Sequence, residues 1–223
     1  MKKHKLFIWL PLTLLIGFHI SINAQVTDVD GNVYKSIKIG GQVWMGKNLN
    51  VSNFRNGDPI PHAESKEAWD KAGDTYSPAW CYYENDSNNG AILGKLYNNY
   101  AVNDERGLAP LGWHIPSDEE WTELTDNLGG NDKAGIKMKS MSMWNTHNNA
   151  REEGIFEALP GGTRSRGKFQ NGGKSVGNDR KGVSTHWWTS TKTYYRSLAY
   201  FAEGVDRDWG SKRTGMSVRC IKD

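Results

Sequence analysis

Four side chains capable of acid–base or metal chemistry lie within seven positions of the segment GWHIPSDEEWTEL, residues 112–124. They are His114, Asp118, Glu119 and Glu120, and imidazole and carboxylate groups of this kind can bind zinc or transfer protons. A zinc site, however, needs several ligands at a regular spacing, and His114 has no such partner in the sequence. We therefore predict neither a metal nor a catalytic role for this cluster.

The same acidic residues are typical of the start of a helix. Pro116 ends any helix before it, Ser117 is a favourable N-cap, and Glu120 completes a Ser-x-x-Glu capping box. Acidic groups in the first turn also interact favourably with the helix dipole. Apolar residues at helical spacing follow, so we predict a helix that ends at Gly129.

Residues 1–24 have the pattern of a secretory signal peptide. Basic residues at positions 2–5 precede an apolar run from Leu6 to Ile20, and Ala24 places a small residue before the expected cleavage site. The run is too short to span a bilayer comfortably, and no second apolar segment follows. We expect export to the periplasm, the cell surface or the medium, with residues 25–223 as one mature domain and no transmembrane segment after cleavage.

Removal of this segment changes the charge of the chain. The 28 Lys and Arg residues lose three lysines, which leaves 25 to balance the 25 Asp and Glu residues. A neutral mature chain has no overall attraction to nucleic acid, so we expect no nucleic-acid partner. The chain contains 10 tryptophans, 9 tyrosines and 25 glycines, which indicates a core of aromatic rings packed between many turns.

The two cysteines are Cys81 and Cys220. An even number of cysteines in an exported protein predicts a disulfide, which would link the middle of the chain to its C-terminus. The alternative is a pair of buried free thiols, because a sequence cannot test the geometry of a bridge.

Strand-forming runs and turn signals divide the rest of the chain. Asp28, Asp30 and Asn32 resemble the start of a calcium loop, but the Gly and Glu of an EF-hand are not at the required offsets, so we predict a plain turn. ENDSNNG at 84–90 predicts another polar turn. We expect strands within 26–44, at 80–83, 154–162, 186–192, 198–204 and 215–223, and short helices at 63–73 and 131–140.

Polar loops that carry aromatic or charged side chains are the candidate ligand-binding regions. Residues 163–185 form a long glycine-rich stretch, and loops of this length in a compact domain are usually functional or disordered. Its candidate contacts are Arg164, Arg166, Phe169, Asn171, Asn178 and Asp179.

A second candidate region is the expected hairpin tip at 206–209. There, Asp206 and Arg207 would supply charge-assisted hydrogen bonds, and Trp209 a stacking face. Tyr194 and Tyr195 lie in another expected polar turn. The alternative for all these rings is that they cover the sheet.

Six segments in this order resemble the Fibrobacter succinogenes major paralogous domain, from about residue 26 to 222. They are VTDVDGNVYKSIKIGGQVWMGKNLN, GKLYNNYAV, LAPLGWHIPSDEEWTEL, FEALPGG, WWTST and SVRCIKD. That family is similar in turn to the C-type lectin-like fold, which also includes formylglycine-generating enzymes. The resemblance implies an α+β fold with two short helices, a twisted and mostly antiparallel sheet, neighbouring N- and C-terminal strands, and a long irregular loop region.

Three functions follow from these features. The first is a non-catalytic binding module for a polysaccharide or an envelope protein; it would be calcium-independent, because the Glu-Pro-Asn, Gln-Pro-Asp and Trp-Asn-Asp triplets of calcium-dependent lectins are absent. The second is an enzyme of the formylglycine-generating type, which needs a reactive cysteine pair. The third is a structural adhesin or fibre subunit that pairs through the C-terminal strand. We favour the first, without a cofactor.

Overall fold

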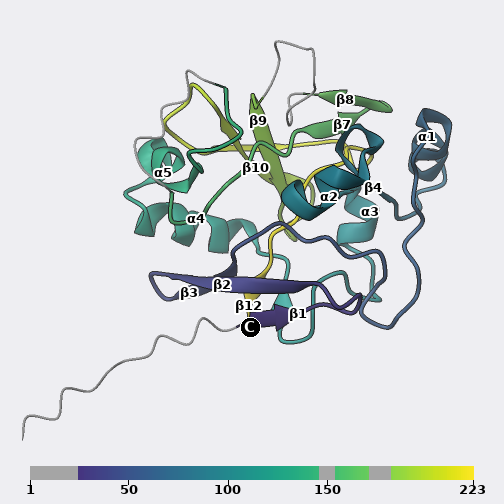
Figure 1. The fold of residues 1–223 in the computed structure, drawn as a ribbon, viewed down its shortest axis with the longest axis horizontal. Helices are drawn as coiled ribbons and strands as arrows, with labels where there is room; N and C mark the ends of the chain where they lie inside the picture. The colour runs from purple at the N-terminus through teal and green to yellow at the C-terminus, as the bar shows by residue number, and fades with distance from the viewer. Residues whose placement is uncertain (1–24, 146–153, 171–181) are drawn as a thin grey trace, which may run out of the picture.

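The structure, a computed structural model, describes residues 25–145, 154–170 and 182–223. Its largest sheet is antiparallel and joins the two ends of this part of the chain (Figure 1). The strand order is β1 (Gln25–Thr27), β2 (Val33–Ile39), β3 (Gln42–Met45), β12 (Ile221–Lys222) and β6 (Trp113–His114). The expected proximity of the N- and C-terminal strands is confirmed, because Ile221 pairs with Trp44.

A second antiparallel sheet has the order β11 (Asp206–Trp209), β10 (Tyr194–Ala199) and β9 (Ser184–Trp188). Two two-stranded antiparallel sheets complete the strands of the described ranges. One pairs β4 (Trp80–Cys81) with β5 (Leu96–Tyr97), and the other pairs β7 (Thr163–Ser165) with β8 (Lys168–Gln170).

Five short α-helices of the described ranges surround these sheets, where the family resemblance implied two. They are α1 (Lys66–Asp74), α2 (Ser87–Leu93), α3 (Asn99–Val102), α4 (Asp118–Asn127) and α5 (Asn131–Met138), and a 3₁₀ turn covers Tyr83–Asn85. Figure 1 shows α4 and α5 on one side of β9 and β10, and α1, α2 and α3 on the other. The α+β class is thus confirmed, with more helix than expected.

Several local predictions were wrong for identifiable reasons. The polar turn at 84–90 contains the start of α2, because the Asp86 side chain caps the helix by accepting from the Asn88 amide. The strand expected at 154–162 is irregular, since Glu157 has a positive φ of 49° that breaks an extended run. Tyr194 and Tyr195 belong to strand β10, and residues 206–209 form an edge strand instead of a hairpin tip.

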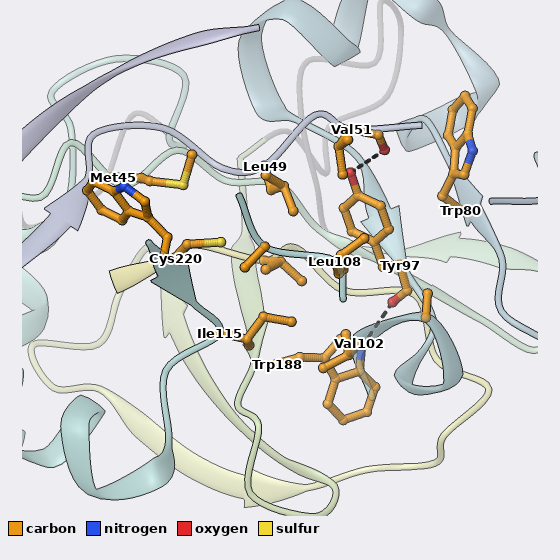
Figure 2. Close-up of a cluster of buried hydrophobic side chains, with 14 of the residues drawn as sticks. Met45, Leu49, Val51, Trp80, Tyr97, Val102, Leu108, Ile115, Trp188 and Cys220 are labelled. Atoms are coloured by element: carbon orange, nitrogen blue, oxygen red, sulfur yellow. Dashed lines mark hydrogen bonds between the residues drawn. The ribbon is translucent and has the colours of Figure 1, made fainter. Parts of the chain in front are cut away.

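The core is rich in aromatic rings, as the composition predicted. In one cluster, shown in Figure 2, Tyr97 donates from its hydroxyl to the Val51 carbonyl at 2.7 Å, and the Trp188 indole donates to the Tyr97 carbonyl at 2.9 Å. In a second cluster the rings of Trp44 and Trp121 lie 4.9 Å apart. Indole and phenol groups thus bury large areas while their polar atoms satisfy loop carbonyls.

The predicted disulfide is wrong. Cys81 and Cys220 are both buried free thiols, and they belong to different hydrophobic clusters. Cys81 lies in strand β4, whereas Cys220 directly precedes β12 and packs with Met45 and Leu49 (Figure 2). Each cysteine therefore acts as a small apolar side chain of its own cluster.

The C-terminal strand offers no free edge, contrary to the adhesin hypothesis. Strand β12 lies between β3 and β6, so both of its sides are occupied within the chain. Among the described residues, no helix has the length and apolar character needed to cross a membrane.

Candidate functional site

The candidate site is built on the outer strand of the three-stranded sheet. Strand β11 pairs only with β10 in the described structure, and all four of its residues are exposed. Trp209 is 72 % exposed, although it belongs to an ordered strand. An indole that is both fixed by a strand and open to solvent can provide a stacking surface for a ligand.

The register places four side chains on one face of this hairpin. Trp209 is opposite Tyr194, and Arg207 is opposite Arg196. The Arg207 guanidinium lies 4.2 Å from the centre of the Tyr194 ring, a cation–π contact. We call Tyr194, Arg207 and Trp209 the edge-strand platform.

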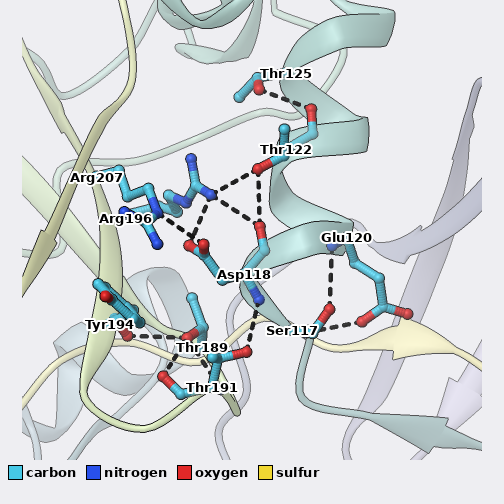
Figure 3. Close-up of polar contacts among 10 residues, drawn as sticks. All are labelled: Ser117, Asp118, Glu120, Thr122, Thr125, Thr189, Thr191, Tyr194, Arg196 and Arg207. Carbon is cyan, nitrogen blue, oxygen red and sulfur yellow. Dashed lines mark hydrogen bonds and ion pairs between the residues drawn. The ribbon is translucent and has the colours of Figure 1, made fainter.

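A buried carboxylate holds the platform in place (Figure 3). Asp118 accepts from Arg207 Nε through Oδ2 and from Arg196 Nη2 through Oδ1, each at 2.7 Å. Arg196 is only 2 % exposed, and its Nη2 also donates to the Thr122 hydroxyl at 2.9 Å. The hydrogen bond with Asp118 raises the pKa of Arg207, whereas burial lowers the pKa of Arg196. Both remain cations at neutral pH, because guanidinium groups are not deprotonated in proteins.

The position of Asp118 depends on the helix start that the sequence predicted. Ser117 and Glu120 form the complete capping box of α4, so this prediction is confirmed. The box places Asp118 as the first helical residue, and its amide donates to the Thr191 hydroxyl at 3.0 Å. Asp118 therefore links α4 to β10 and β11, a role in tertiary structure that the sequence analysis missed.

Two other sequence candidates lie on the opposite face of the same hairpin. Tyr195 and Asp206 alternate with the platform residues along β10 and β11. The Tyr195 hydroxyl lies 3.4 Å from Asp208 Oδ2, and its ring makes an edge contact with Trp188. The structure therefore does not bring Tyr195 or Asp206 together with Trp209.

A groove of about 590 Å³ lies beside the turn that follows β11. Arg166, in the β7–β8 turn, lines it together with Asp70 and Asp74 of α1 and with Arg213. Arg213 forms an ion pair with Asp74. The segment 206–214 thus contributes to both the platform and the groove, and the groove includes the exposed candidate Arg166 of the glycine-rich stretch.

The other candidates of that stretch are not open to a ligand in the same way. Arg164 is 1 % exposed and donates to the carbonyls of Ala63 and Glu64. Its guanidinium lies 4.9 Å from the Trp69 ring and 4.8 Å from the Phe169 ring. Arg164 and Phe169 thus hold the β7–β8 hairpin against α1. Asn171, Asn178 and Asp179 lie outside the described residues.

His114 has two carboxylate partners. Its Nδ1 lies 2.7 Å from Asp223 Oδ1, and its Nε2 lies 2.8 Å from Glu120 Oε1. Burial disfavours the imidazolium, but the hydrogen bonds with Asp223 and Glu120 outweigh it and raise the pKa of His114. Across the described ranges, no group of His, Cys, Asp and Glu residues is arranged to hold a metal ion.

Comparison with known proteins identifies the chain at the level of a family. The model of the Fibrobacter succinogenes major domain matches residues 37–222. No curated protein and no solved structure matches the chain. Because the match covers most of the sequence and extends from β2 to β12, the chain belongs to the Fibrobacter succinogenes major domain family.

Proposed function

We propose that this protein is an exported, non-catalytic binding module that recognises a polysaccharide through the edge-strand platform. The observation that carries the proposal is the 72 % exposure of Trp209 on a strand whose neighbouring arginine is anchored to buried Asp118. Exposed aromatic side chains on rigid elements bind ligands with little loss of conformational freedom. Stacking on an indole face suits the apolar face of a sugar ring.

The surroundings of Trp209 suit a hydroxylated ligand. Arg207 has one guanidinium nitrogen on Asp118, and donors on its other nitrogens can form charge-assisted hydrogen bonds to sugar oxygens. The groove beside residues 211–214 offers two carboxylates and two arginines for further hydroxyl groups. None of these contacts requires calcium, so the proposed recognition is calcium-independent.

The proposed architecture is C-type lectin-like. The antiparallel sheet that joins the chain ends, the neighbouring short helices and the irregular segments support it. Export is proposed from the signal-peptide pattern of residues 1–24, which lie outside the described part. The ligand is therefore expected in the envelope or beyond it.

The cysteines favour a binding module over an enzyme of the formylglycine-generating type. Such an enzyme needs accessible, reactive thiols. Burial raises the pKa of the Cys81 thiol to about 11 and raises that of Cys220 further. At neutral pH both side chains remain protonated and enclosed, which is the opposite of an activated nucleophile.

A second candidate is protein binding by strand addition to β11, because its outer edge is unpaired in the described structure. Its side chains Asp206, Arg207 and Asp208 are charged, and charge is typical of edges protected against pairing. We therefore rank an envelope-protein partner below a polysaccharide.

The test is a polysaccharide binding screen with Trp209→Ala. We expect the variant to lose at least about tenfold in affinity, as stacking contacts contribute on the order of 1–2 kcal/mol, with an unchanged melting temperature. Phe201→Ala is the matched control, since Phe201 is 68 % exposed at the other end of the β10–β11 hairpin. A chelator should leave binding unchanged. Equal loss of stability and binding in Trp209→Ala would show that the ring has a structural role.

A further inference from the structure

A small cavity lies apart from the edge-strand platform, at the meeting point of distant chain segments. Its volume is about 220 Å³. Its polar lining comes from Lys47, Asn48, Ser140, Ser142, Glu157 and Arg219. Three of the segments that carry the family resemblance, around residues 47, 157 and 219, therefore converge on this cavity.

Arg219 is the unusual member of this lining. It is 2 % exposed, yet it forms no ion pair within the described part of the chain. Nε donates to Asn48 Oδ1 at 3.1 Å and Nη1 to the Phe156 carbonyl, and the guanidinium lies 4.2 Å from the Phe156 ring. Burial lowers the pKa of Arg219 to about 9, which still leaves a cation at neutral pH.

The other buried arginines differ from Arg219 in what surrounds them. Arg196 is neutralised by Asp118, and Arg164 has both Nη atoms on carbonyl groups. Arg219 forms no ion pair with a carboxylate: the exposed Glu157 of the same lining only moderates the lowering of its pKa, and Arg219 Nη2 has no hydrogen-bond partner among the described residues. A buried cation is costly unless a counter-charge or hydrogen bonds compensate it. Because Arg219 also lines a cavity, an external anion can supply that counter-charge.

A second cavity of about 200 Å³ adjoins the first, because Lys47, Asn48 and Ile92 line both. It also contains Asn50, whose buried Oδ1 accepts no hydrogen bond. A buried acceptor without a donor is unfavourable, so this atom suits a ligand hydroxyl. Ile92 is 47 % exposed and offers an apolar contact between the two polar ends.

We propose that these adjoining cavities bind a sugar acid, with its carboxylate on Arg219 and a ring hydroxyl donating to Asn50. Arginine binds carboxylates strongly because its planar donors match the two carboxylate oxygens. The inference rests on the proposed polysaccharide binding and names acidic sugar units as a second point of recognition. Lys47 and Glu157 are exposed at the lining and set its charge.

The experiment is calorimetric titration of the folded protein with galacturonate and, as the uncharged probe of the same ring, galactose. We expect galacturonate to bind at least about tenfold more tightly, the effect of one charge-assisted contact. Lys47→Glu should weaken galacturonate binding, whereas Glu157→Gln should strengthen it. Opposite effects of two exposed positions cannot arise from a loss of folding. Arg219→Lys keeps the positive charge but removes the planar pair of guanidinium donors. We expect this variant to have a smaller preference for galacturonate over galactose.

Trp209→Ala separates this inference from the proposed function. The variant should bind galacturonate like the unmodified protein, because the platform and the cavities are lined by different residues. Equal binding of galactose and galacturonate, no binding of either at tens of millimolar, or indifference to Lys47→Glu and Glu157→Gln would overturn the sugar-acid site. Tighter binding of an N-acetylated amino acid than of galacturonate would also overturn it, in favour of a peptide carboxylate.

Discussion

Two buried arginines, Arg196 and Arg219, are compensated in different ways. Arg196 lies against Asp118, which also binds Arg207, so that region contains a carboxylate shared by two cations. Arg219 lies against the Phe156 and Trp187 rings and binds only neutral acceptors. Both arginines are 2 % exposed, so burial alone does not distinguish them.

The difference indicates which region is closed and which is open to a ligand. The Asp118 network positions a surface residue, Arg207, and leaves no charge of Arg196 uncompensated. The Arg219 region has a cation, a donor without a partner and a cavity, and the acid in its lining, Glu157, is exposed and forms no ion pair with Arg219 among the described residues. An ion pair that is complete within the chain fixes structure, whereas an incomplete one can be completed by a ligand.

The largest expected effect comes from removing the shared carboxylate. Asp118→Asn leaves Arg196 buried beside a neutral amide, so we expect a loss of about 3–5 kcal/mol in the free energy of unfolding. Urea denaturation measures this loss. Glu119→Gln is the matched control, because Glu119 is an exposed acid in the same helical turn and should change stability little. A cost for Asp118→Asn no greater than that of the control would contradict the role of the network.

A smaller effect is expected at the other arginine. Arg219→Met keeps an apolar contact with Phe156 and removes the donor to the Phe156 carbonyl, while Asn48 Oδ1 still accepts from the Trp187 indole. No unpaired charge is left buried. We expect a loss of about 1–3 kcal/mol in the same urea experiment. A loss as large as that of Asp118→Asn would mean that Arg219 is a structural element of equal weight, and the comparison of the two regions would fail.

These two regions also show what the sequence could predict. The sequence predicts the capping box because Ser117 and Glu120 are only three residues apart, so their interaction forms a recognisable local motif. The sequence does not predict the two partners of Asp118, because Arg196 and Arg207 are 78 and 89 residues away in the chain. The charged neighbours of Trp209 made it a candidate ligand contact but left open whether its ring covers the sheet. Its exposed place in an edge strand depends on pairing with β10.

The glycine-rich stretch shows the same limit. Its charged side chains suggested ligand contacts, yet Arg164 packs between the Trp69 and Phe169 rings, and only pairing of β7 with β8 reveals this. The sequence predicted no site at Arg219, because this residue lies among apolar residues next to an expected strand. A buried arginine in an apolar segment is the signal that could have identified it, since such a charge needs a partner.

The ion pairs of His114 are expected to make a modest, pH-dependent contribution to the free energy of unfolding. Unlike the buried arginines, His114 is partly open to solvent. Its folded pKa is raised by Asp223 and Glu120, so its stabilisation is fully present below the unfolded pKa of about 6.5 and is lost as pH rises through the folded pKa. The side chain is 40 % exposed, so we expect less than about 1 kcal/mol. Urea denaturation at about pH 5.5 and about pH 8.5 should show this loss as a lower free energy of unfolding at the higher pH. His114→Gln should remove it, and an unchanged pH dependence in that variant would assign the effect elsewhere.

The smallest effect is expected from a reducing agent. This experiment tests whether noncovalent contacts alone stabilise the Arg219 region. Cys220 follows Arg219 directly, whereas Cys81 lies in the cluster beside Arg164. A bridge between them would therefore tie the Arg219 region covalently to the cluster of Cys81. The structure instead places two free thiols in separate clusters. Dithiothreitol should therefore leave the melting temperature unchanged, and both thiols should react with a titrating reagent only after unfolding. A fall of roughly 10 °C in the melting temperature would show that a disulfide exists, because a domain of this length loses about that much when it loses a few kcal/mol of stability. The losses of stability in Asp118→Asn and Arg219→Met could then no longer be compared as effects of noncovalent contacts alone.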